Sequence, residues 1–500
     1  MKIWHQFPSL RLHPFLLDVL TTGLTQVSTL AANFLMVSVI SRSMGVVVLG
    51  EYLLVKRVSG WLLVGSQLGL GIALPRQIAS TAANTQMRAL QYFLAAAVIL
   101  VAFVAITGSV AAWNAERVAR WCLGSQNQGL VYGMLLLLFG TAGQAMVYGY
   151  FRGLERVQMA NLVGLGGAVV VPMLALGATY KAHSAPLLIG VTGVGLTIAF
   201  GFWAVPKMLA ARWSYQQLCM DARQLLTYGA ARVPGDIAFG GLLTLGPMLA
   251  AHYVNIAENS YLLLGITSLT MTGVAFAPMG MVLLARISRL LGAGRGRDVN
   301  EIVGYLHSAV LQVSLILVVQ GLIFARPLML WWLGPSCLPG IPVIRMVLLA
   351  IPAYMYYTAL RSVVDAASPQ AYNGRNVLIT MSVLIALLAA AVAFVSQEHL
   401  VMAVAAATTV SVCVLAIATH RTLQTLQLAD RSPQFGSIWL AGLLGTTSVT
   451  AQLAFHFQIT KPAFAMVVLI NVGLAFLFLR KSQPKWLGFV LRVAVPRAGA

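Results

Sequence analysis

Apolar segments long enough to cross a lipid bilayer recur along almost the whole chain. A spanning helix needs about 20 mostly apolar residues, and about fourteen segments meet that requirement. The expected spans are residues 15–40, 51–74, 89–112, 129–151, 159–180, 186–208, 227–252, 260–285, 302–325, 342–364, 376–395, 400–419, 435–455 and 462–480. The connections between them are short, and the longest internal one lies between Ala210 and Thr227. This pattern predicts an all-α polytopic membrane protein.

Several residues recur at a nearly constant spacing, which indicates an internal duplication. Tyr52 and Tyr261, Tyr148 and Tyr357, and Arg152 and Arg361 are each 209 positions apart, and Arg76 and Arg286 are 210 apart. With six spans in each copy, the two halves have the same orientation and are related by an axis along the membrane normal. We expect one six-helix lobe in residues 1–220, a second in 221–430, and two additional spans with a basic amphipathic tail in 431–500.

The composition agrees with a membrane protein and assigns much of the charge to topology. Hydrophobic residues make up 59% of the chain and charged residues 9%, whereas a soluble domain has about a quarter charged residues. Lys and Arg number 32 against 12 Asp and Glu, a net charge of +20. With the N-terminus in the cytoplasm, most basic residues fall on the inner side, which places both termini inside. The excess therefore indicates orientation, and no nucleic-acid partner is expected.

No motif for catalysis, ATP hydrolysis or metal binding is evident in the sequence. The cysteines are Cys122, Cys219, Cys337 and Cys413, which are far apart and form no CxxC pair. The chain has no Walker lysine motif, no HExxH and no nucleophile elbow. We expect no enzyme activity, no catalytic residue, no cofactor and no metal site.

Arg232 and Asp236 are charged residues at the start of the apolar segment from about Tyr228 to His252. They are four positions apart and therefore share one face of a helix. An ionised side chain at membrane depth costs several kcal/mol unless it is paired or wetted, so both are candidates for a functional site. Two interpretations remain open. The pair either neutralises itself and joins two helices, or Arg232 faces a wet central cavity and Asp236 sets its orientation.

Polar residues form continuous faces on the first two expected spans. The face of span 15–40 holds Asp18, Thr22, Thr25, Thr29 and Asn33, and the face of span 51–74 holds Lys56, Ser59, Gly60, Ser66 and Gln67. Such a stripe faces water or another polar helix, not lipid. Arg57 follows Lys56 directly, and adjacent residues diverge by about 100° on a helix. We therefore expect one of the two to face the cavity while the other extends to the outer headgroups.

The tenth expected span adds further basic residues. Arg345 lies just inside it, and Arg361 and Asp365 repeat the four-apart pairing near its inner end. Counted together, the inward-facing candidates carry more positive than negative charge. A cavity with net positive charge attracts a phosphate or pyrophosphate, whose geometry matches that of arginine.

Aromatic residues accompany these charges. Tyr354, Tyr356 and Tyr357 either offer ring faces to a bound sugar or anchor the helix at the interface. Trp331 and Trp332 follow Pro327, and we expect both in the outer aromatic belt.

The first two spans carry the motifs of a known family. Ser41-Arg42-Ser43-Met44-Gly45, Leu49-Gly50-Glu51-Tyr52, and Gly69-Leu70-Gly71 followed by Arg76 resemble the first hairpin of polysaccharide transporters. These include the O-antigen (Wzx-type) flippases of the multidrug/oligosaccharidyl-lipid/polysaccharide (MOP) exporter superfamily. The stretch from Arg232 to Asp236 and the pair Arg361 and Asp365 resemble the second half of that family.

The resemblance implies two six-helix lobes, as in MATE transporters, around a central cavity. It also implies alternating access that moves an undecaprenyl-diphosphate-linked oligosaccharide outward across the bacterial inner membrane. The glycan would be an O-antigen, exopolysaccharide or capsule repeat unit, and a polysaccharide polymerase and glycosyltransferases would be partners. The predicted substrate-binding residues are Arg232, Asp236, Lys56, Arg57, Arg345, Arg361, Asp18, Asn33 and Gln67.

Three alternatives remain. A drug or cation antiporter of the same superfamily needs an unpaired acid in the cavity, and Asp18 is the candidate. A lipid II flippase uses fourteen spans, of which the last two help form a groove for the lipid tail. This chain has Thr22, Thr25 and Thr29 in place of the arginines associated with that group. A membrane scaffold for polysaccharide synthesis would have no need of polar stripes around a cavity.

Overall fold

The computed structural model describes residues 14–80, 86–210, 214–230, 233–274, 283, 287–368 and 370–428. Throughout these ranges the regular structure is helical. We call residues 14–230 the N-half and residues 233–428 the C-half. The last two expected spans, 435–455 and 462–480, and the basic tail lie outside the described residues.

The N-half consists of long helices joined by short turns, with two π-helical segments. Its elements are α1 (Pro14–Val39), η1 (Ile40–Met44), α2 (Val46–Gln67), α3 (Leu70–Ser80), α4 (Gln86–Trp113), α5 (Ala115–Leu123), α6 (Gln128–Gly153), α7 (Val157–Leu165), η2 (Gly166–Val170), α8 (Val171–Thr179), η3 (Tyr180–Ala182), α9 (Ala185–Ala210) and α10 (Tyr215–Ala230).

The C-half repeats this style of construction, with more of its spans broken into two helices. Its elements are α11 (Val233–Leu242), α12 (Leu245–Tyr253), α13 (Ile256–Val274), α15 (Gly296–Ile323), α16 (Ala325–Leu333), η4 (Pro335–Gly340), α17 (Ile341–Leu348), α18 (Ile351–Ala367), α19 (Tyr372–Phe394) and α20 (Gln397–Thr425).

Eight of the described helices are long and apolar enough to cross a membrane. Three further pairs qualify if each bent pair is one span: α2 with α3 (47°), α11 with α12 (45°), and the segment Pro335–Leu348 with α18 (47°). The described residues thus provide eight to eleven candidate spans. The expected total of fourteen stays a prediction. The expected eighth span, 260–285, is represented by α13, and most of its remainder is outside the described residues.

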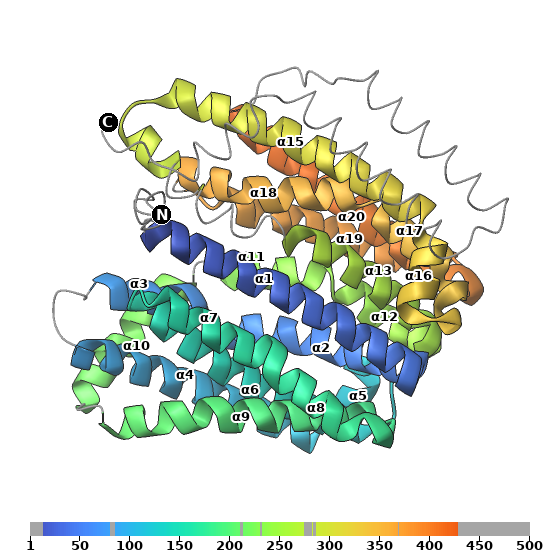
Figure 1. Ribbon diagram of the computed structural model, residues 1–500, viewed down its shortest axis with the longest axis horizontal. Coiled ribbons are helices and arrows are strands. Elements are labelled where there is room, and N and C mark those ends of the chain that lie inside the picture. Colours follow the sequence, from blue (N-terminus) through green and yellow to red (C-terminus); the bar gives the residue numbers. More distant parts are fainter. Residues whose placement is uncertain are drawn as a thin grey trace, which may run out of the picture.

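The helices of the two halves occupy different parts of the molecule, with α1 between them (Figure 1). Within the N-half, α6 packs along α9 and α2; within the C-half, α15 packs against α18 and α19 against α20. Helix α1 contacts α7 and α8 on one side and α13 and α16 on the other. We call the left side of Figure 1 the α3 end and the right side the α16 end. The topology predicted from the basic residues makes the α3 end cytoplasmic.

The connection expected between Ala210 and Thr227 is a helix in the structure. Helix α10 (Tyr215–Ala230) packs against α3 and α4. We therefore assign residues up to Ala230 to the N-half, although the expected lobe ended at residue 220. Gly69 allows the close crossing of α10, because a Cβ there would lie 2.4 Å from the Gly229 carbonyl oxygen. Its φ of +78° also permits the bend between α2 and α3. The next helix, α11, begins at Val233.

The predicted topology can be tested by cysteine labelling in intact cells, on a chain whose four native cysteines are replaced. His399→Cys and Glu258→Cys, at the α16 end, should react with an impermeant thiol reagent added from outside. Arg297→Cys, an exposed position at the α3 end, should react only after the cells are opened. Labelling of residue 297 from outside would show that the orientation is the reverse.

Candidate functional site

Side chains from the end of α1 and from η1 join the two halves at the α16 end. Ser38 donates a 2.6 Å hydrogen bond to the Trp332 carbonyl, and Ser41 donates a 2.9 Å bond to the Leu333 carbonyl. Arg42 donates through Nε to the Trp332 carbonyl at 3.1 Å and through Nη2 to the Trp331 carbonyl. The acceptors are carbonyls of the last turn of α16, which lack partners within that helix. We call these bonds the η1–α16 contact.

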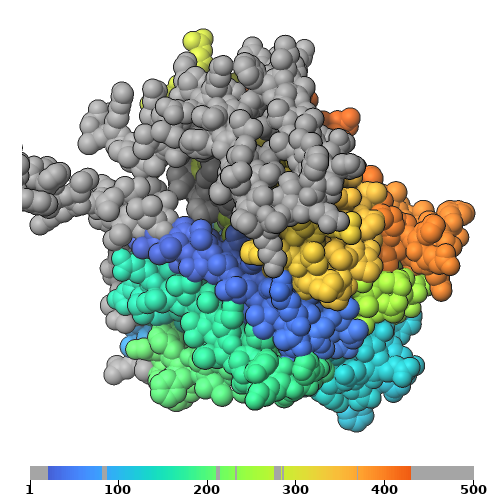
Figure 2. Space-filling view, turned by 45° about the vertical axis from the view of Figure 1, so that its right-hand side comes forward, coloured from blue at the N-terminus to red at the C-terminus, as the bar shows by residue number. Residues whose placement is uncertain are grey.

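An aromatic stack strengthens the η1–α16 contact. The rings of Phe34 and Trp332 are parallel to within 5° with centroids 4.3 Å apart, and Trp332 Nε1 donates a 2.8 Å hydrogen bond to the Phe34 carbonyl. Figure 2 shows the yellow surface around α16 directly against the blue surface of the first helices. The expectation of two belt tryptophans is therefore wrong for Trp332, which is 3% exposed, whereas Trp331 is 65% exposed.

A pocket of about 180 Å³ lies between the halves toward the α3 end. Its N-half wall comes from the bend between α2 and α3, and its C-half wall comes from α11. The lining residues are Val64, Gln67, Gly69, Gly71, Ile72, Asp236, Phe239 and Gly240. The structure therefore brings together Gln67 and Asp236, two of the predicted site residues, from opposite halves. Asp236 is exposed and Gln67 is half-buried.

Arg361 lies behind the C-half wall of this pocket. Its guanidinium carbon is 6.0 Å from the centroid of the Phe239 ring, and the Phe239 and Tyr357 rings are 5.3 Å apart. Arg361 stands one turn after Tyr357 on α18. Asp365, one turn on, accepts a 2.8 Å hydrogen bond from Asn373. A basic side chain, an acid (Asp236) and an aromatic wall thus lie together at this end of the interface.

Lys56 and Arg57 point in different directions, as their adjacent positions on α2 predict. Lys56 Nζ donates a 2.6 Å hydrogen bond to Asn33 on α1, which brings two more predicted residues together. Arg57 is half-buried and reaches across the interface, where its Nη1 lies 3.5 Å from the Leu243 carbonyl at the break between α11 and α12. Leu243 lies between α11 and α12, so Arg57 of the N-half supplies a hydrogen-bond donor to the backbone at this break in the C-half.

The other predicted residues lie apart from the pocket or outside the described residues. Arg232 directly precedes α11 and is outside them. Asp18 is half-buried in the first turns of α1, at the α3 end. Arg345 is exposed on α17 and does not line the pocket of Gln67 and Asp236.

The polar stripe of α1 contacts another polar side chain at its α3 end. Thr22 and Thr25 are 9% and 8% exposed. Asn161 of α7 donates to Thr22 Oγ1 at 3.2 Å, and Thr25 donates to the backbone carbonyl of Thr21 at 2.9 Å. This part of the stripe packs α1 onto the N-half, while Asn33 carries the stripe to Lys56.

The three tyrosines of α18 are buried, with exposures of 3–8% for Tyr354, Tyr356 and Tyr357. They offer no open ring faces to a sugar, and they are not anchors at a surface either. Tyr357 supports the pocket wall through Phe239, and Tyr356 bonds to two histidines of neighbouring helices. The sequence gives no sign of this, because aromatic residues in an apolar helix look alike whether they face lipid, sugar or other helices.

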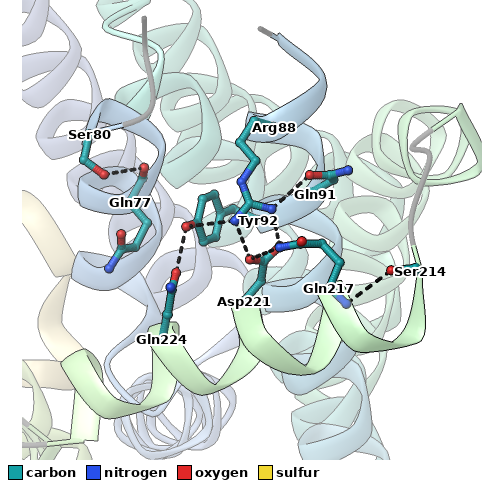
Figure 3. Close-up of polar contacts among 9 residues, drawn as sticks. All are labelled: Gln77, Ser80, Arg88, Gln91, Tyr92, Ser214, Gln217, Asp221 and Gln224. Atoms are coloured by element: carbon teal, nitrogen blue, oxygen red, sulfur yellow. Dashed lines mark hydrogen bonds and ion pairs between the residues drawn. The ribbon is translucent and has the colours of Figure 1, made fainter. Parts of the chain in front are cut away.

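A buried ion pair that the sequence did not reveal fixes α10 to the N-half (Figure 3). Asp221 of α10 is 1% exposed and accepts two hydrogen bonds from Arg88 of α4, at 2.7 and 2.9 Å. Gln217 donates a third bond to Asp221 at 2.9 Å, and Tyr92 donates to Gln224 at 2.8 Å. Both charged residues lie in stretches that sequence analysis assigns to the inner surface, so the burial of Asp221 was not expected.

The comparisons with known proteins identify the fold. No protein-family model matches the sequence, and no curated protein matches it. A solved structure described as lipid II flippase MurJ in an inward closed conformation superposes with a TM-score of 0.69 at 12% identity, covering 94% of this chain and 99% of that chain. An inward-facing MATE family transporter of the MOP superfamily gives 0.61 at 12% identity, covering 82% and 99%. The chain has the MOP-type fold.

A third structure, a MOP superfamily transporter from Pyrococcus furiosus, gives a TM-score of 0.55 at 12% identity, covering 83% of this chain and 96% of that chain. These likenesses, together with the apolar helices, show a multi-pass membrane protein and confirm the predicted fold type. The narrower placement among polysaccharide transporters stays a prediction.

Loss of the α10 ion pair should lower stability. Arg88→Ala leaves the buried carboxylate of Asp221 without its cation, which costs about 3 kcal/mol where a buried pair is broken. We expect Arg88→Ala to have a clearly lower unfolding temperature in detergent than Arg223→Ala, which removes an exposed arginine of α10. Adding Asp221→Asn to Arg88→Ala should restore part of the loss. Equal unfolding temperatures for Arg88→Ala and Arg223→Ala would contradict this role.

Proposed function

We propose that the chain is a flippase that moves a polyprenyl-diphosphate-linked oligosaccharide across the membrane by alternating access. The observation that carries the proposal is the set of basic side chains along the interface of the halves in a MOP-type fold. Lys56 and Arg57 come from the N-half, where they bond to Asn33 and to the Leu243 carbonyl. Arg361 comes from the C-half, beside Phe239 of the pocket whose acid is Asp236. Arg232 completes this set in the proposal.

The structural comparisons favour a lipid-linked substrate over a drug. The lipid II flippase MurJ covers 94% of this chain, whereas the two MATE and MOP transporters cover 82% and 83%. The superposition on MurJ therefore includes a part of this chain that the superpositions on the other two transporters leave out. The MATE-type antiporter is the weaker alternative on this ground.

The chemistry of each residue follows from its position. A diphosphate has two adjacent charged groups, which arginine binds through paired N–H donors. Arg57 and Arg361 lie on opposite halves, so a headgroup bound by both would hold the halves together at one stage of transport. Gln67 offers an amide to sugar hydroxyls, and Asp236 limits the net charge of the pocket. The η1–α16 contact closes the other end of the interface and has to break for release there.

We infer further that the lipid carrier is undecaprenyl diphosphate and that its glycan is an O-antigen, exopolysaccharide or capsule repeat unit. The protein would then act in a bacterial inner membrane with both termini in the cytoplasm, supplied by glycosyltransferases and followed by a polysaccharide polymerase. Membrane lipids would surround both lobes, 1–220 and 221–430, and the region 431–500. Lipid II is the second candidate substrate, favoured by the superposition on MurJ.

The proposal can be tested in proteoliposomes that contain a fluorescent polyprenyl-diphosphate disaccharide. Movement between leaflets is measured by quenching with an impermeant reductant. Arg57→Ala, Arg361→Ala and Arg232→Ala should each reduce the flipping rate about tenfold or more, because a hydrogen bond to a charged group contributes about 1.5–3 kcal/mol. Arg232→Lys should recover only part of the rate, since an ammonium cannot form a bidentate phosphate contact.

The matched control is Arg117→Ala, an exposed arginine of α5, which should flip at the unchanged rate. Vesicles with lipid II in place of the disaccharide lipid separate the two candidate substrates. Unimpaired flipping of both lipids by Arg57→Ala and Arg361→Ala, at matched protein levels, would remove the basis of the proposal.

The acids distinguish a flippase from a cation antiporter. In an antiporter the coupling acid binds and releases a cation in each cycle, so its amide variant stops transport. In the proposed flippase, Asp18→Asn should keep near-normal flipping and Asp236→Asn should reduce it less than Arg232→Ala does. Complete loss with Asp18→Asn, together with normal activity of Arg232→Ala and uptake of a cationic dye, would identify an antiporter.

A further inference from the structure

A chain of hydrogen bonds links two histidines through one tyrosine inside the C-half. The Tyr356 hydroxyl of α18 is 3.1 Å from Nδ1 of His307 on α15 and 2.9 Å from Nδ1 of His420 on α20. Nε2 of His420 is 3.1 Å from Nε2 of Gln424, an amide nitrogen that donates to the neutral ring. Tyr356 is 4% exposed, and both histidines are half-buried.

The bonding pattern requires the two imidazoles to differ. A tyrosine hydroxyl has one proton, so it donates to one Nδ1 and accepts from the other, which must carry a hydrogen. A single added proton on His420 Nε2 fits this chain once the Gln424 amide turns its oxygen toward that ring nitrogen. The protonated His420 then donates to Gln424 and to the Tyr356 oxygen, while the hydroxyl donates to His307. A second proton would place two positive rings with centroids 5.6 Å apart, which repel each other. The geometry therefore suits one exchangeable proton.

The helices around the two imidazoles carry other titratable groups among the described residues. On the three helices these are Arg297, Asp298, Glu301, Tyr305, Tyr354, Tyr357, Arg361, Asp365, Glu398, His399, Cys413 and Arg421, and on the adjoining α19 they are Tyr372 and Arg375. Those of α12, α13, α16 and α17 are His252, Tyr253, Glu258, Tyr261, Arg326 and Arg345. Imidazole is the side chain that ordinarily titrates between pH 5 and 8.

The same helix connects the histidines to the candidate pocket. Tyr356 faces α15 and α20, and the next residue, Tyr357, packs against Phe239 of the pocket wall. Arg361, one turn on, lies over the same Phe239 ring. A change in how firmly α18 is bonded to α15 and α20 therefore acts on the wall that carries Phe239.

We propose that His307, Tyr356 and His420 form a proton-binding site that couples the protonation of the C-half to the movement of the two halves. This rests on the alternating movement in the proposed function. With the proton bound, the bonds between the helices become charge-assisted and stronger, so α18 is held against α15 and α20. Without it, α18 and the pocket wall are freer to move. The ligand is the proton itself, and the water-accessible side is the one where His420 and Gln424 lie.

The test measures distances in the full-length protein in lipid nanodiscs and needs no transport substrate. Nitroxide labels are attached at Ser80→Cys and Ala371→Cys, exposed positions at the α3 end of each half, after replacement of the native cysteines. Pulsed electron paramagnetic resonance then gives the distance distribution between pH 5.5 and 8. We expect a narrow distribution at pH 5.5 that broadens and shifts as the pH is raised to 8, the range in which imidazole side chains exchange protons.

Tyr356→Phe keeps the buried ring but removes the hydroxyl that joins the histidines, and His420→Gln removes the titrating ring. Both should lose most of the pH-dependent shift while eluting as folded protein. His399→Gln, an exposed histidine of α20, should keep it in full. A full pH response in Tyr356→Phe, or no response in the unchanged protein, would overturn the proposal. Either result leaves the flipping assay unaffected, so failure of this inference is distinguishable from failure of the proposed function.

Discussion

The arrangement of the two halves depends on the hydrogen-bond donors that reach the last backbone carbonyls of α16. The last carbonyls of α16 have no partners in their own helix, and a buried carbonyl without a hydrogen-bond donor costs free energy. Ser38, Ser41 and Arg42 supply these donors from the other half of the chain. Hydrogen bonds to backbone carbonyls hold the halves together, yet water can replace the donors when the halves separate. That combination suits an interface that opens and closes.

The pocket lies toward the other end of the interface. Gln67 and Asp236 approach each other there from α2 and α11, and Arg57 and Lys56 use two different acceptors, the Leu243 carbonyl and Asn33. Each basic side chain is thus held by a neutral acceptor rather than by a carboxylate. Their positive charge remains available to an anion, which is the physical reason for preferring a phosphate-bearing substrate.

The sequence predicted the architecture well because long apolar runs in a membrane protein have few possible structures. It predicted Gln67, Lys56 and Asn33 as members of polar faces and Asp236 as the partner of Arg232. The structure brings Gln67 together with Asp236 and Lys56 together with Asn33. Prediction from the sequence failed where burial depends on a distant partner. Asp221 drew no prediction, because its burial depends on Arg88 of another helix. Trp332 was predicted for the aromatic belt, but it packs against Phe34. The role of Arg345 could not be derived either, because spacing along a helix does not tell which of several neighbours covers a face.

The ion pair of Arg88 with Asp221 also limits how the halves can move. It keeps α10 on the N-half as far as Ala230, and α11 of the C-half begins at Val233. Consecutive Cα atoms are about 3.8 Å apart, so these two residues can be separated by no more than about 11 Å. The covalent link is a short tether at the α3 end. Large displacements must therefore occur as rotation about this tether, with the greatest travel at the opposite rim of the molecule and the least beside the pocket.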